Sequence, residues 1–287
     1  MKYTAGIDIG STYTKAVILS SDDQILGKAM QNTGFKLTEV AEQCYEKAVA
    51  EAGLDAADID YIVSTGFGRH QARISDVHVT DLTAAARGSG FLFPNTRTIL
   101  DVGGQTMKAS RVDDRAKVKS FRLNDKCAAG TGAFLEKTAR YIGFSTQDIG
   151  PLVATSKENV PVSGVCAVFA ESEVINHLSQ GMAPADIMYG AIVSLVGRSV
   201  QLMKRVKMEP EYTLIGGILR FETMIDVVRE TLGAEVNVPE GELVQFTSAL
   251  GAAILGHRRL AKQGQTATSE AKNQAENQAK NQERASA

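Results

Sequence analysis

Three short apolar runs separated by polar turns open the chain and predict a β-meander. The runs cover residues 4–9, 16–20 and 25–31. The turns between them are rich in Gly, Ser, Asp and Gln, and turns of this kind join antiparallel strands. The first turn, residues 10–15, leads into a strand, so it is not a P-loop, which needs a helix directly after its glycines.

Further along the chain, apolar residues with helical spacing alternate with short buried runs. Residues 37–52 carry one apolar face and predict an amphipathic helix. A buried strand is expected at 59–64 and a short helix at 83–90. Because Cys44 lies on the apolar face of the first helix, we interpret it as a small core residue and not as a ligand.

The pattern of the opening meander is repeated in the middle of the chain. The strand at 4–9 runs into Asp8-Ile9-Gly10-Ser11-Thr12, and a strand at 98–102 runs into Asp101-Val102-Gly103-Gly104-Gln105-Thr106. Strands starting at 107 and 117 complete the second meander. Two such units indicate two related halves that close on a phosphate chain from both sides.

The second half of the chain is predominantly helical. Helices are predicted at 132–142, 166–178, 185–203 and 245–260. Short strands are expected at 213–215, which ends in Gly216-Gly217, and at 235–238. Small residues between 249 and 253 allow the last helix to approach another backbone closely. From about residue 263 the chain is rich in Ala, Gln, Asn, Lys and Glu without large apolar residues, which predicts a disordered tail.

Composition and charge narrow the class of protein. The chain has 287 residues, 44% of them hydrophobic, and a net charge of −2. It can therefore bury a large core, and it has no charge excess that favours nucleic acid or a membrane surface. It shows neither a signal peptide nor an apolar run of membrane-spanning length. With three cysteines and no secretion signal, we expect a cytoplasmic protein with reduced thiols.

The first glycine turn carries candidate phosphate-binding groups. Its backbone N–H groups, the hydroxyls of Ser11 and Thr12 and the ammonium of Lys15 can hold a phosphate. Asp8, directly before the turn, can hold a hydrated Mg²⁺ or orient a water molecule. The alternative is an ordinary hairpin with a lysine on its surface.

Two of the three cysteines stand in similar settings. Cys127 lies in Asn124-Asp125-Lys126-Cys127-Ala128-Ala129-Gly130-Thr131-Gly132, and Cys166 begins Cys166-Ala167-Val168-Phe169-Ala170-Glu171-Ser172-Glu173-Val174. Each precedes a predicted helix, whose N-terminus lowers the pKa of a nearby thiol and strengthens it as a ligand. The alternative is that both are small buried residues.

The repeated strand, Asp and glycine turn, followed by Gly216-Gly217 before a late helix, resembles the acetate and sugar kinase, Hsp70 and actin superfamily. The resemblance covers residues 4 to about 260. It implies an α/β fold: a duplicated RNase H-like, two-domain ATPase. We expect one subdomain of residues 1–94 with 251–262, a second of residues 95–250, and a disordered tail at 263–287.

The two cysteine runs resemble a narrower group, the BadF/BadG/BcrA/BcrD-type ATPases. These are the activators of 2-hydroxyacyl-CoA dehydratases and the ATPase subunits of benzoyl-CoA reductases. The resemblance implies a [4Fe–4S] cluster shared by two subunits, with Cys127 and Cys166 as ligands. A cubane cluster needs four thiolates, so two chains with two suitable cysteines each agree with this. The second subunit would be an identical chain or a homologous ATPase subunit.

The same resemblance implies the partners and the direction of electron transfer. Reduced ferredoxin or flavodoxin would supply the electron. ATP hydrolysis would drive the electron uphill into a CoA-ester reductase or dehydratase component. Two other classes stay open: a small-molecule kinase of the same fold, which would need an acceptor pocket, and a scaffolding ATPase of the actin type. Bound iron would separate the first class from both others.

The resemblance also assigns roles residue by residue. Phosphate contacts are expected from Gly10, Ser11, Thr12, Thr14, Lys15, Gly103, Gly104, Gln105 and Thr106. The nucleoside is expected near Gly216, Gly217 and Gln245, and catalysis with Mg²⁺ or water is expected at Asp8, Asp101 and Gln105. One position departs from the pattern, because the activators commonly carry Asp where this chain has Thr106. Thr cannot supply a carboxylate to a metal-bound water, and it would suit a diverged subunit of a hetero-oligomeric reductase.

Overall fold

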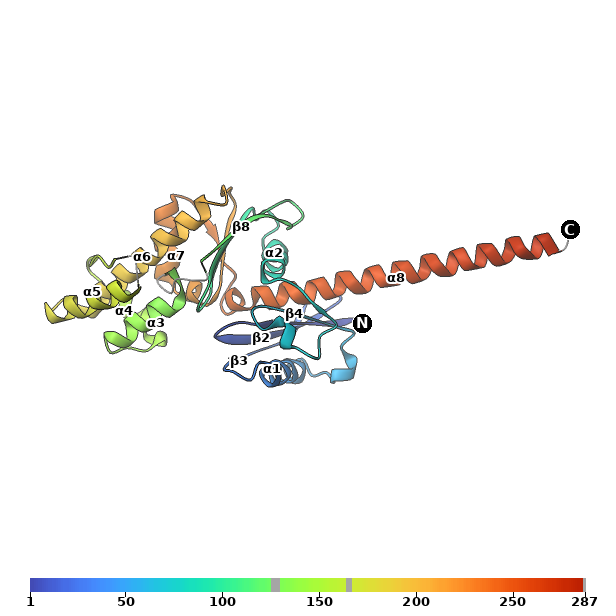
Figure 1. Cartoon of the computed structure of the whole chain (residues 1–287), viewed down its shortest axis with the longest axis horizontal. Helices are drawn as coiled ribbons and strands as arrows, with labels where there is room; N and C mark the ends of the chain where they lie inside the picture. The colour runs from blue at the N-terminus through green and yellow to red at the C-terminus, as the bar shows by residue number, and fades with distance from the viewer. Residues whose placement is uncertain (125–129, 164–166, 286–287) are drawn as a thin grey trace.

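The computed structural model describes residues 1–124, 130–163 and 167–285 (Figure 1). These residues form two five-stranded sheets with helices packed against them. The long helix α8 (Leu243–Ala285) begins beside the second sheet, passes along the first and then leaves the rest of the molecule, as Figure 1 shows.

The first sheet contains the predicted opening meander at its centre. Its order is β3-β2-β1-β4-β5, and β1 pairs antiparallel with β2 and parallel with β4. The strands are β1 (Tyr3–Ile9), β2 (Tyr13–Ser20), β3 (Ile25–Asn32), β4 (Tyr61–Thr65) and β5 (Val77–His78). The predicted meander and the strand at 59–64 are therefore confirmed.

The second sheet repeats this topology. Its order is β10-β9-β6-β7-β8, and β6 pairs antiparallel with β7 and parallel with β9. The strands are β6 (Thr98–Val102), β7 (Met107–Val112), β8 (Val118–Asn124), β9 (Tyr212–Ile215) and β10 (Val236–Asn237). Position for position, β6 to β10 correspond to β1 to β5, so the duplication read from the two glycine turns extends to the whole sheet.

Helices fill the space around both sheets. They are α1 (Leu37–Glu51), α2 (Asp81–Leu92), α3 (Gly132–Tyr141), α4 (Ile149–Val153), α5 (Ala167–Ser179), α6 (Pro184–Lys204) and α7 (Glu222–Leu232). Short 3₁₀ helices lie at Ala56–Asp58, Arg69–Gln71, Thr146–Asp148 and Gly217–Arg220.

Both sheets are buried on two faces, which explains why their central strands read as continuous apolar runs. In β2, Ala16 and Ile18 pack against α1, whereas the alternate residues Val17 and Leu19 pack against α8. In the second sheet, Leu100 and Met107 face the large core formed with α3, α6 and α7. Ile99 instead packs against alanines of α2. Cys44 is fully buried on the inner face of α1, as predicted.

Glycines allow α2, α8 and the first sheet to touch backbone to backbone. A Cβ atom at Gly251 would lie 1.9 Å from the Ala84 carbonyl oxygen of α2. A Cβ atom at Gly88 would lie 2.0 Å from the Thr247 carbonyl oxygen of α8, and one at Gly6 would lie 1.9 Å from that of Ala249. The close approach expected from the small residues of the last helix is therefore confirmed.

This crossing yields a prediction for stability. Gly251→Ala is expected to lower the free energy of unfolding by at least about 2 kcal/mol, because the new methyl group meets backbone that cannot move aside. Gly197→Ala is the matched control, since a Cβ atom in this helical position would meet no atom within 4 Å. It should be neutral or stabilising, because Ala favours helix over Gly. Equal denaturant midpoints for the two variants would contradict the close backbone contact between α2 and α8.

The helices differ from the predictions mainly at their ends. The helix expected at 83–90 covers Asp81–Leu92, because Thr80 caps it and accepts a hydrogen bond from the Thr83 N–H. The predicted disordered tail instead continues α8 to Ala285. Its Ala, Gln, Glu and Lys residues are good helix formers, so a helix can extend through a segment too polar to build a core. None of the described helices combines the length and apolar character required to cross a bilayer.

Candidate nucleotide-binding site

The first glycine turn is held by an Asp–Lys pair on neighbouring strands. The Gly10 N–H donates to the Tyr13 carbonyl oxygen over 3.1 Å and closes the turn between β1 and β2. Asp8 and Lys15 are direct partners in the strand register, and Lys15 Nζ lies 3.3 Å from Asp8 Oδ2. Only 13% and 15% of the Asp8 and Lys15 side chains are exposed, so the charges meet in a largely desolvated place.

Thr14 takes a different position from the other residues of this turn. It is fully buried, and its hydroxyl shares a hydrogen bond of 2.9 Å with the hydroxyl of Thr33. The Thr14 carbonyl oxygen accepts a contact of 3.4 Å from Cys44 Sγ, and burial raises the pKa of the Cys44 thiol to about 11. Thr14 therefore packs inside the protein under the turn, whereas Ser11 and Thr12 are partly exposed to solvent.

The second glycine turn has the same construction. The Gly103 N–H donates to the Thr106 carbonyl oxygen over 2.8 Å, as Gly10 does to Tyr13. Asp101 and Lys108 are partners in the register of β6 and β7, and Lys108 Nζ lies 3.4 Å from Asp101 Oδ2. Lys108 was not among the site residues predicted from the sequence. Its signal was available, because Lys108 follows Asp101 by the same seven positions that separate Lys15 from Asp8.

Lys108 also binds a second carboxylate at the start of α2. Its Nζ lies 2.7 Å from Asp81 Oδ2. Burial by itself would lower the pKa of Lys108, but Asp101 and Asp81 outweigh burial and raise it. Burial likewise acts to raise the pKa of Asp81, yet Lys108 holds it below the usual range. Lys108 is therefore a buried cation that ties α2 to the second turn.

The two acids beneath the glycine turns lie close enough to interact. Burial raises the pKa of Asp101, and the negative charges of Asp81 and Asp8 add to this effect, while Lys108 opposes it. Asp8 and Asp101 come from different sheets, and their mutual repulsion shows that the ends of β1 and β6 lie near each other. Two neighbouring carboxylates of this kind are groups that a hydrated divalent cation would neutralise.

The glycine turns themselves also meet. A Cβ atom at Gly104 would lie 2.2 Å from Thr12 Oγ1, so the second turn rests directly on the first. Gln105, at the tip of the second turn, is exposed, and Thr106 is half-buried. This contact joins the two halves of the chain at the point where both expose backbone groups suited to phosphate binding.

Gly66 and Gly216 occupy matching places in the two sheets. Gly216 follows β9 with φ +104°, and a Cβ atom there would lie 2.4 Å from the Val102 carbonyl oxygen and 2.9 Å from Asp101 Oδ1. Gly66 follows β4 with φ +88°, and its Cβ atom would lie 2.4 Å from Asp8 Oδ1. Gly66 was not predicted as a site residue. The left-handed backbone and the close approach to the acid both require glycine.

The predicted nucleoside-facing residues lie together. A Cβ atom at Gly217 would lie 3.3 Å from Gln245 Oε1, so the start of the Gly217–Arg220 turn faces the first turn of α8. The Gly216 N–H donates to the Val244 carbonyl oxygen over 2.8 Å and fixes this arrangement. The structure thus brings Gly216, Gly217 and Gln245 into one group beside Asp101.

Helix α3 begins on the second glycine turn. The Gly132 N–H donates to the Gly103 carbonyl oxygen over 3.0 Å, and the Ala133 N–H donates to that of Gly104 over 2.7 Å. The first N–H groups of α3 thus bind the turn itself. Cys127, which precedes α3, and Cys166, which precedes α5, both lie outside the described residues.

Solved structures show which class of protein has this architecture. A ROK-family glucokinase from Streptomyces griseus, 14% identical with a TM-score of 0.57, shares the fold. The activator of the 2-hydroxyisocaproyl-CoA dehydratase from Clostridium difficile with bound ADPNP is much more similar. It is 36% identical with a TM-score of 0.85, and the match covers 92% of this chain and 97% of that one. The fold is therefore that of the actin, Hsp70 and sugar-kinase ATPases.

Sequence comparison identifies the family. Residues 5–256 match the BadF/BadG/BcrA/BcrD ATPase family, and the chain belongs to it. The 2-hydroxyisocaproyl-CoA dehydratase activator of Clostridioides difficile is 37% identical over 94% of this chain and 99% of its own length. A benzoyl-CoA reductase subunit of Thauera aromatica is 34% identical over 94% of this chain and its full length. The chain is thus an ATPase, and the resemblance drawn from the two cysteine runs is confirmed.

Proposed function

We propose that this chain is an ATP-dependent electron-transfer subunit. It would use ATP hydrolysis to deliver low-potential electrons to a CoA-ester dehydratase or reductase. One observation carries the proposal: the N–H groups of Gly132 and Ala133 bind the carbonyl oxygens of the second glycine turn. The helix that follows the Cys127 run is therefore attached directly to a segment that would contact phosphate.

Two halves from different sheets would hold the nucleotide. Ser11, Thr12 and Lys15 would bind phosphate from the first turn, and Gly103, Gly104 and Gln105 from the second. Asp8 and Asp101 would bind Mg²⁺ through water and position the attacking water. Gly216, Gly217 and Gln245 would face the nucleoside. The ADPNP bound to the related activator from Clostridium difficile supports a nucleotide site in this chain.

The residues around the cysteines suit a shared iron–sulfur cluster. Cys127 lies five positions before the start of α3, and Cys166 comes directly before α5. The two helices are joined by Glu171 of α5, which accepts from Lys137 Nζ over 3.2 Å and from the Tyr141 hydroxyl over 3.1 Å. Two such chains would supply four thiolates. When bound, a [4Fe–4S] cluster supplies one-electron chemistry that no side chain here can perform.

Coupling would run through the second turn and α3. ATP can change redox behaviour only if it binds two arrangements of the protein with different affinity. The second turn lies where the two predicted halves meet, which are residues 1–94 with 251–262 and residues 95–250. Phosphate contacts at Gly103 and Gly104 would move this turn relative to the first half. The hydrogen bonds to Gly132 and Ala133 would transmit this shift to α3 and to the Cys127 run.

The partners follow from the proposed chemistry. The second ATPase subunit would be an identical chain or a homologous one, and Thr106 favours a diverged subunit because it lacks a carboxylate at the turn. Ferredoxin or flavodoxin would serve as the electron donor. A CoA-ester dehydratase or reductase component would receive the electron, in agreement with the names of the two relatives.

Iron analysis tests the proposal. Protein purified without oxygen is expected to carry about two irons per chain, because each chain would hold half of a four-iron cluster. Cys127→Ser and Cys166→Ser should each remove the iron. Cys44→Ala is the matched control and should retain it, because the Cys44 thiol is buried beneath the first turn, where it contacts the Thr14 and Ala29 carbonyl oxygens.

The control for a missing partner is co-expression with a homologous ATPase subunit. If the chain binds ATP but holds no iron either alone or with that subunit, the electron-transfer proposal is wrong. The same conclusion follows if the two serine variants retain as much iron as Cys44→Ala. ATPase activity is measured in the same samples to show that each variant is folded.

A further inference from the structure

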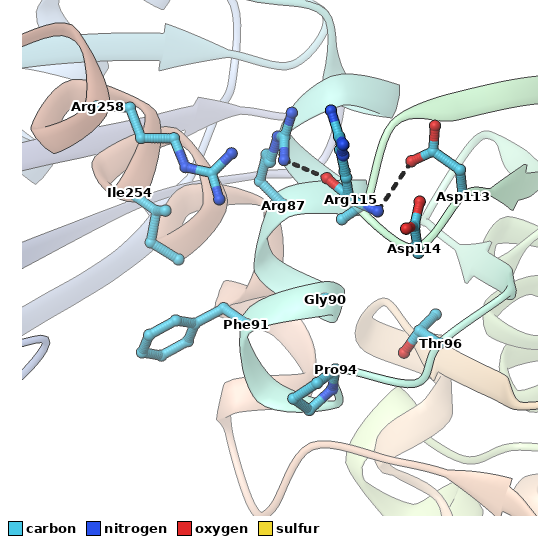
Figure 2. A pocket seen from close by; sticks show the side chains of 11 residues that line it. Arg87, Gly90, Phe91, Pro94, Thr96, Asp113, Asp114, Arg115, Ile254 and Arg258 are labelled. Atoms are coloured by element: carbon cyan, nitrogen blue, oxygen red, sulfur yellow. Dashed lines mark hydrogen bonds between the residues drawn. The ribbon is translucent and has the colours of Figure 1, made fainter. Parts of the chain in front are cut away.

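A pocket lies at the far end of β7 from the second glycine turn. It is formed by α2, by α8 and by the turn that joins β7 to β8 (Figure 2), and its volume is about 580 Å³. Because β7 runs from the second glycine turn to this pocket, the two sites are at opposite ends of one strand. None of the proposed nucleotide-binding residues lines it.

Three guanidinium groups from three different segments line the pocket. Arg87 comes from α2, Arg258 from α8 and Arg115 from the β7–β8 turn, and Figure 2 shows them along one side. Arg87 donates a hydrogen bond to the Arg115 carbonyl oxygen, but its Nε atom is buried without any hydrogen-bond partner. Burial lowers the pKa of Arg87, and the positive charge of Arg258 lowers it further, whereas Asp113 opposes this. The two guanidinium groups therefore repel each other across the pocket.

The carboxylates of the pocket do not neutralise these arginines. Asp113 is engaged by its own hairpin: it accepts from the N–H groups of Arg115 and Lys117 over 3.0 and 2.9 Å and pairs with Lys119 Nζ at 3.3 Å. Asp114 is exposed at the rim. In the part of the chain that the structure describes, no ion pair joins a carboxylate to Arg87, Arg115 or Arg258. The pocket thus keeps a net positive charge.

Apolar side chains form another part of the lining. Phe91, at the end of α2, and Pro94, just after it, lie below the arginines in Figure 2, and Ile254 of α8 lies next to Arg258. The Phe91 side chain remains 37% exposed although it lies beside buried helix surface. A volume of about 580 Å³ with one charged and one apolar wall is typical of a site for a small organic molecule.

We propose that this pocket binds a small phosphate-bearing molecule. The phosphate would lie between Arg87 and Arg258, and the organic part would lie against Phe91 and Ile254. A phosphate dianion offers several oxygens to two guanidinium groups and relieves their mutual repulsion, and Arg is the side chain best suited to such contacts.

A ligand here would connect the two halves of the ATPase. Ile254 and Arg258 belong to α8, which packs on the first sheet, whereas Arg115 belongs to a hairpin of the second sheet. A molecule held by both stabilises one relative position of the halves. Coupling between two binding sites is reciprocal. If nucleotide changes the affinity of the protein for the pocket ligand by some factor, the pocket ligand changes the affinity for nucleotide by the same factor.

Calorimetry on the full chain tests this proposal. Excess ADP with Mg²⁺ fills the nucleotide site, and pyrophosphate and coenzyme A are then titrated as phosphate-bearing probes. Pantetheine, which lacks phosphate, is the comparison ligand. One-to-one binding of pyrophosphate or coenzyme A is expected, with affinity at least about tenfold lower in Arg87→Gln and in Arg258→Gln. Arg259→Gln, at the next position of α8 and outside the pocket, is the matched control and should bind normally.

Several results would overturn the proposal. One is the absence of saturable binding by either phosphate probe at concentrations of about 10 mM. Another is binding that Arg87→Gln and Arg258→Gln leave unchanged, or that pantetheine reproduces with equal affinity. Circular dichroism and the ADP affinity of each variant show that it is folded. The experiment does not involve iron, so its outcome is independent of the electron-transfer proposal.

Discussion

Lys108→Met is expected to lower the free energy of unfolding by about 3–5 kcal/mol, because it leaves two largely desolvated carboxylates without their cation. Lys108 Nζ lies 2.7 Å from Asp81 and 3.4 Å from Asp101, and its side chain is only 15% exposed. Without it, the pKa of Asp101 would rise further, because Lys108 opposes the effect of burial on this carboxyl group. Denaturant unfolding at neutral pH measures the loss, and ATP hydrolysis should fall with it.

The pH dependence of the stability lost in Lys108→Met follows from the directions in which the pKa values of Lys108 and Asp81 are shifted. The raised pKa of Lys108 means that its stabilising contribution is fully present below the usual lysine pKa and is lost as pH rises through the raised value. The lowered pKa of Asp81 means that its contribution is present above the usual Asp range and is lost as pH falls through the lowered value. The difference between wild type and Lys108→Met should therefore be largest near neutral pH and shrink in acid.

Two controls separate this network from a general loss of charge. Lys117→Met removes an exposed lysine from the turn after the same strand and should change stability by less than about 0.5 kcal/mol. Adding Asp81→Asn to Lys108→Met removes one of the two stranded carboxylates and should recover part of the loss. A Lys108→Met protein as stable as wild type, or a double variant less stable than the single one, would show that the lysine does not hold these acids.

Asp8→Asn is expected to slow ATP hydrolysis by about a hundredfold or more, since the neutral amide can neither bind Mg²⁺ through water as a carboxylate does nor orient the attacking water. Asp8 is only 9% exposed and lies 3.3 Å from Lys15. The substitution keeps the size of the side chain. Phosphate release at saturating ATP measures the effect, and nucleotide affinity is determined in parallel.

The matched control is Asp22→Asn, which removes an exposed carboxylate from the turn between β2 and β3. It should leave hydrolysis unchanged. Lys15→Met should weaken nucleotide binding more than it changes the rate at saturation, because in the proposed site Lys15 would contribute charge to phosphate binding. If Asp8→Asn hydrolyses ATP at the wild-type rate while its nucleotide affinity is unchanged, Asp8 has no part in the chemical step.

Both predictions rest on a repeated unit of two strands and a glycine turn. In each unit an acid on the first strand faces a lysine on the second: Asp8 with Lys15, and Asp101 with Lys108. A glycine with positive φ then packs against the acid, Gly66 in one half and Gly216 in the other. The second unit differs by the additional carboxylate of Asp81, which makes it the more strongly charged of the two.

The repeated turns, the meanders and the family resemblance could all be predicted from the sequence, because they depend on local order. Alternating apolar runs define strands, and the glycines of the turns stand next to the acids whose position they fix. The Asp–Lys spacing was equally local, but Lys108 was overlooked because the predicted second turn ended at Thr106, whereas the predicted first turn extended to Lys15. Gly66 was overlooked because its partner, Asp8, is 58 positions away and becomes its neighbour only through parallel pairing.

By itself, the amino-acid sequence determined the class of fold, the two glycine turns and the two cysteine runs. Only the tertiary structure decided which distant groups share a place: Asp81 with Lys108, Gly132 with Gly103, and Arg87 with Arg258. The physical reason is that the influence of a side chain on a pKa or on a ligand falls off over a few ångströms in space. The number of residues between two side chains does not give their distance in space. That distance is set when the chain folds into two sheets joined by crossing helices.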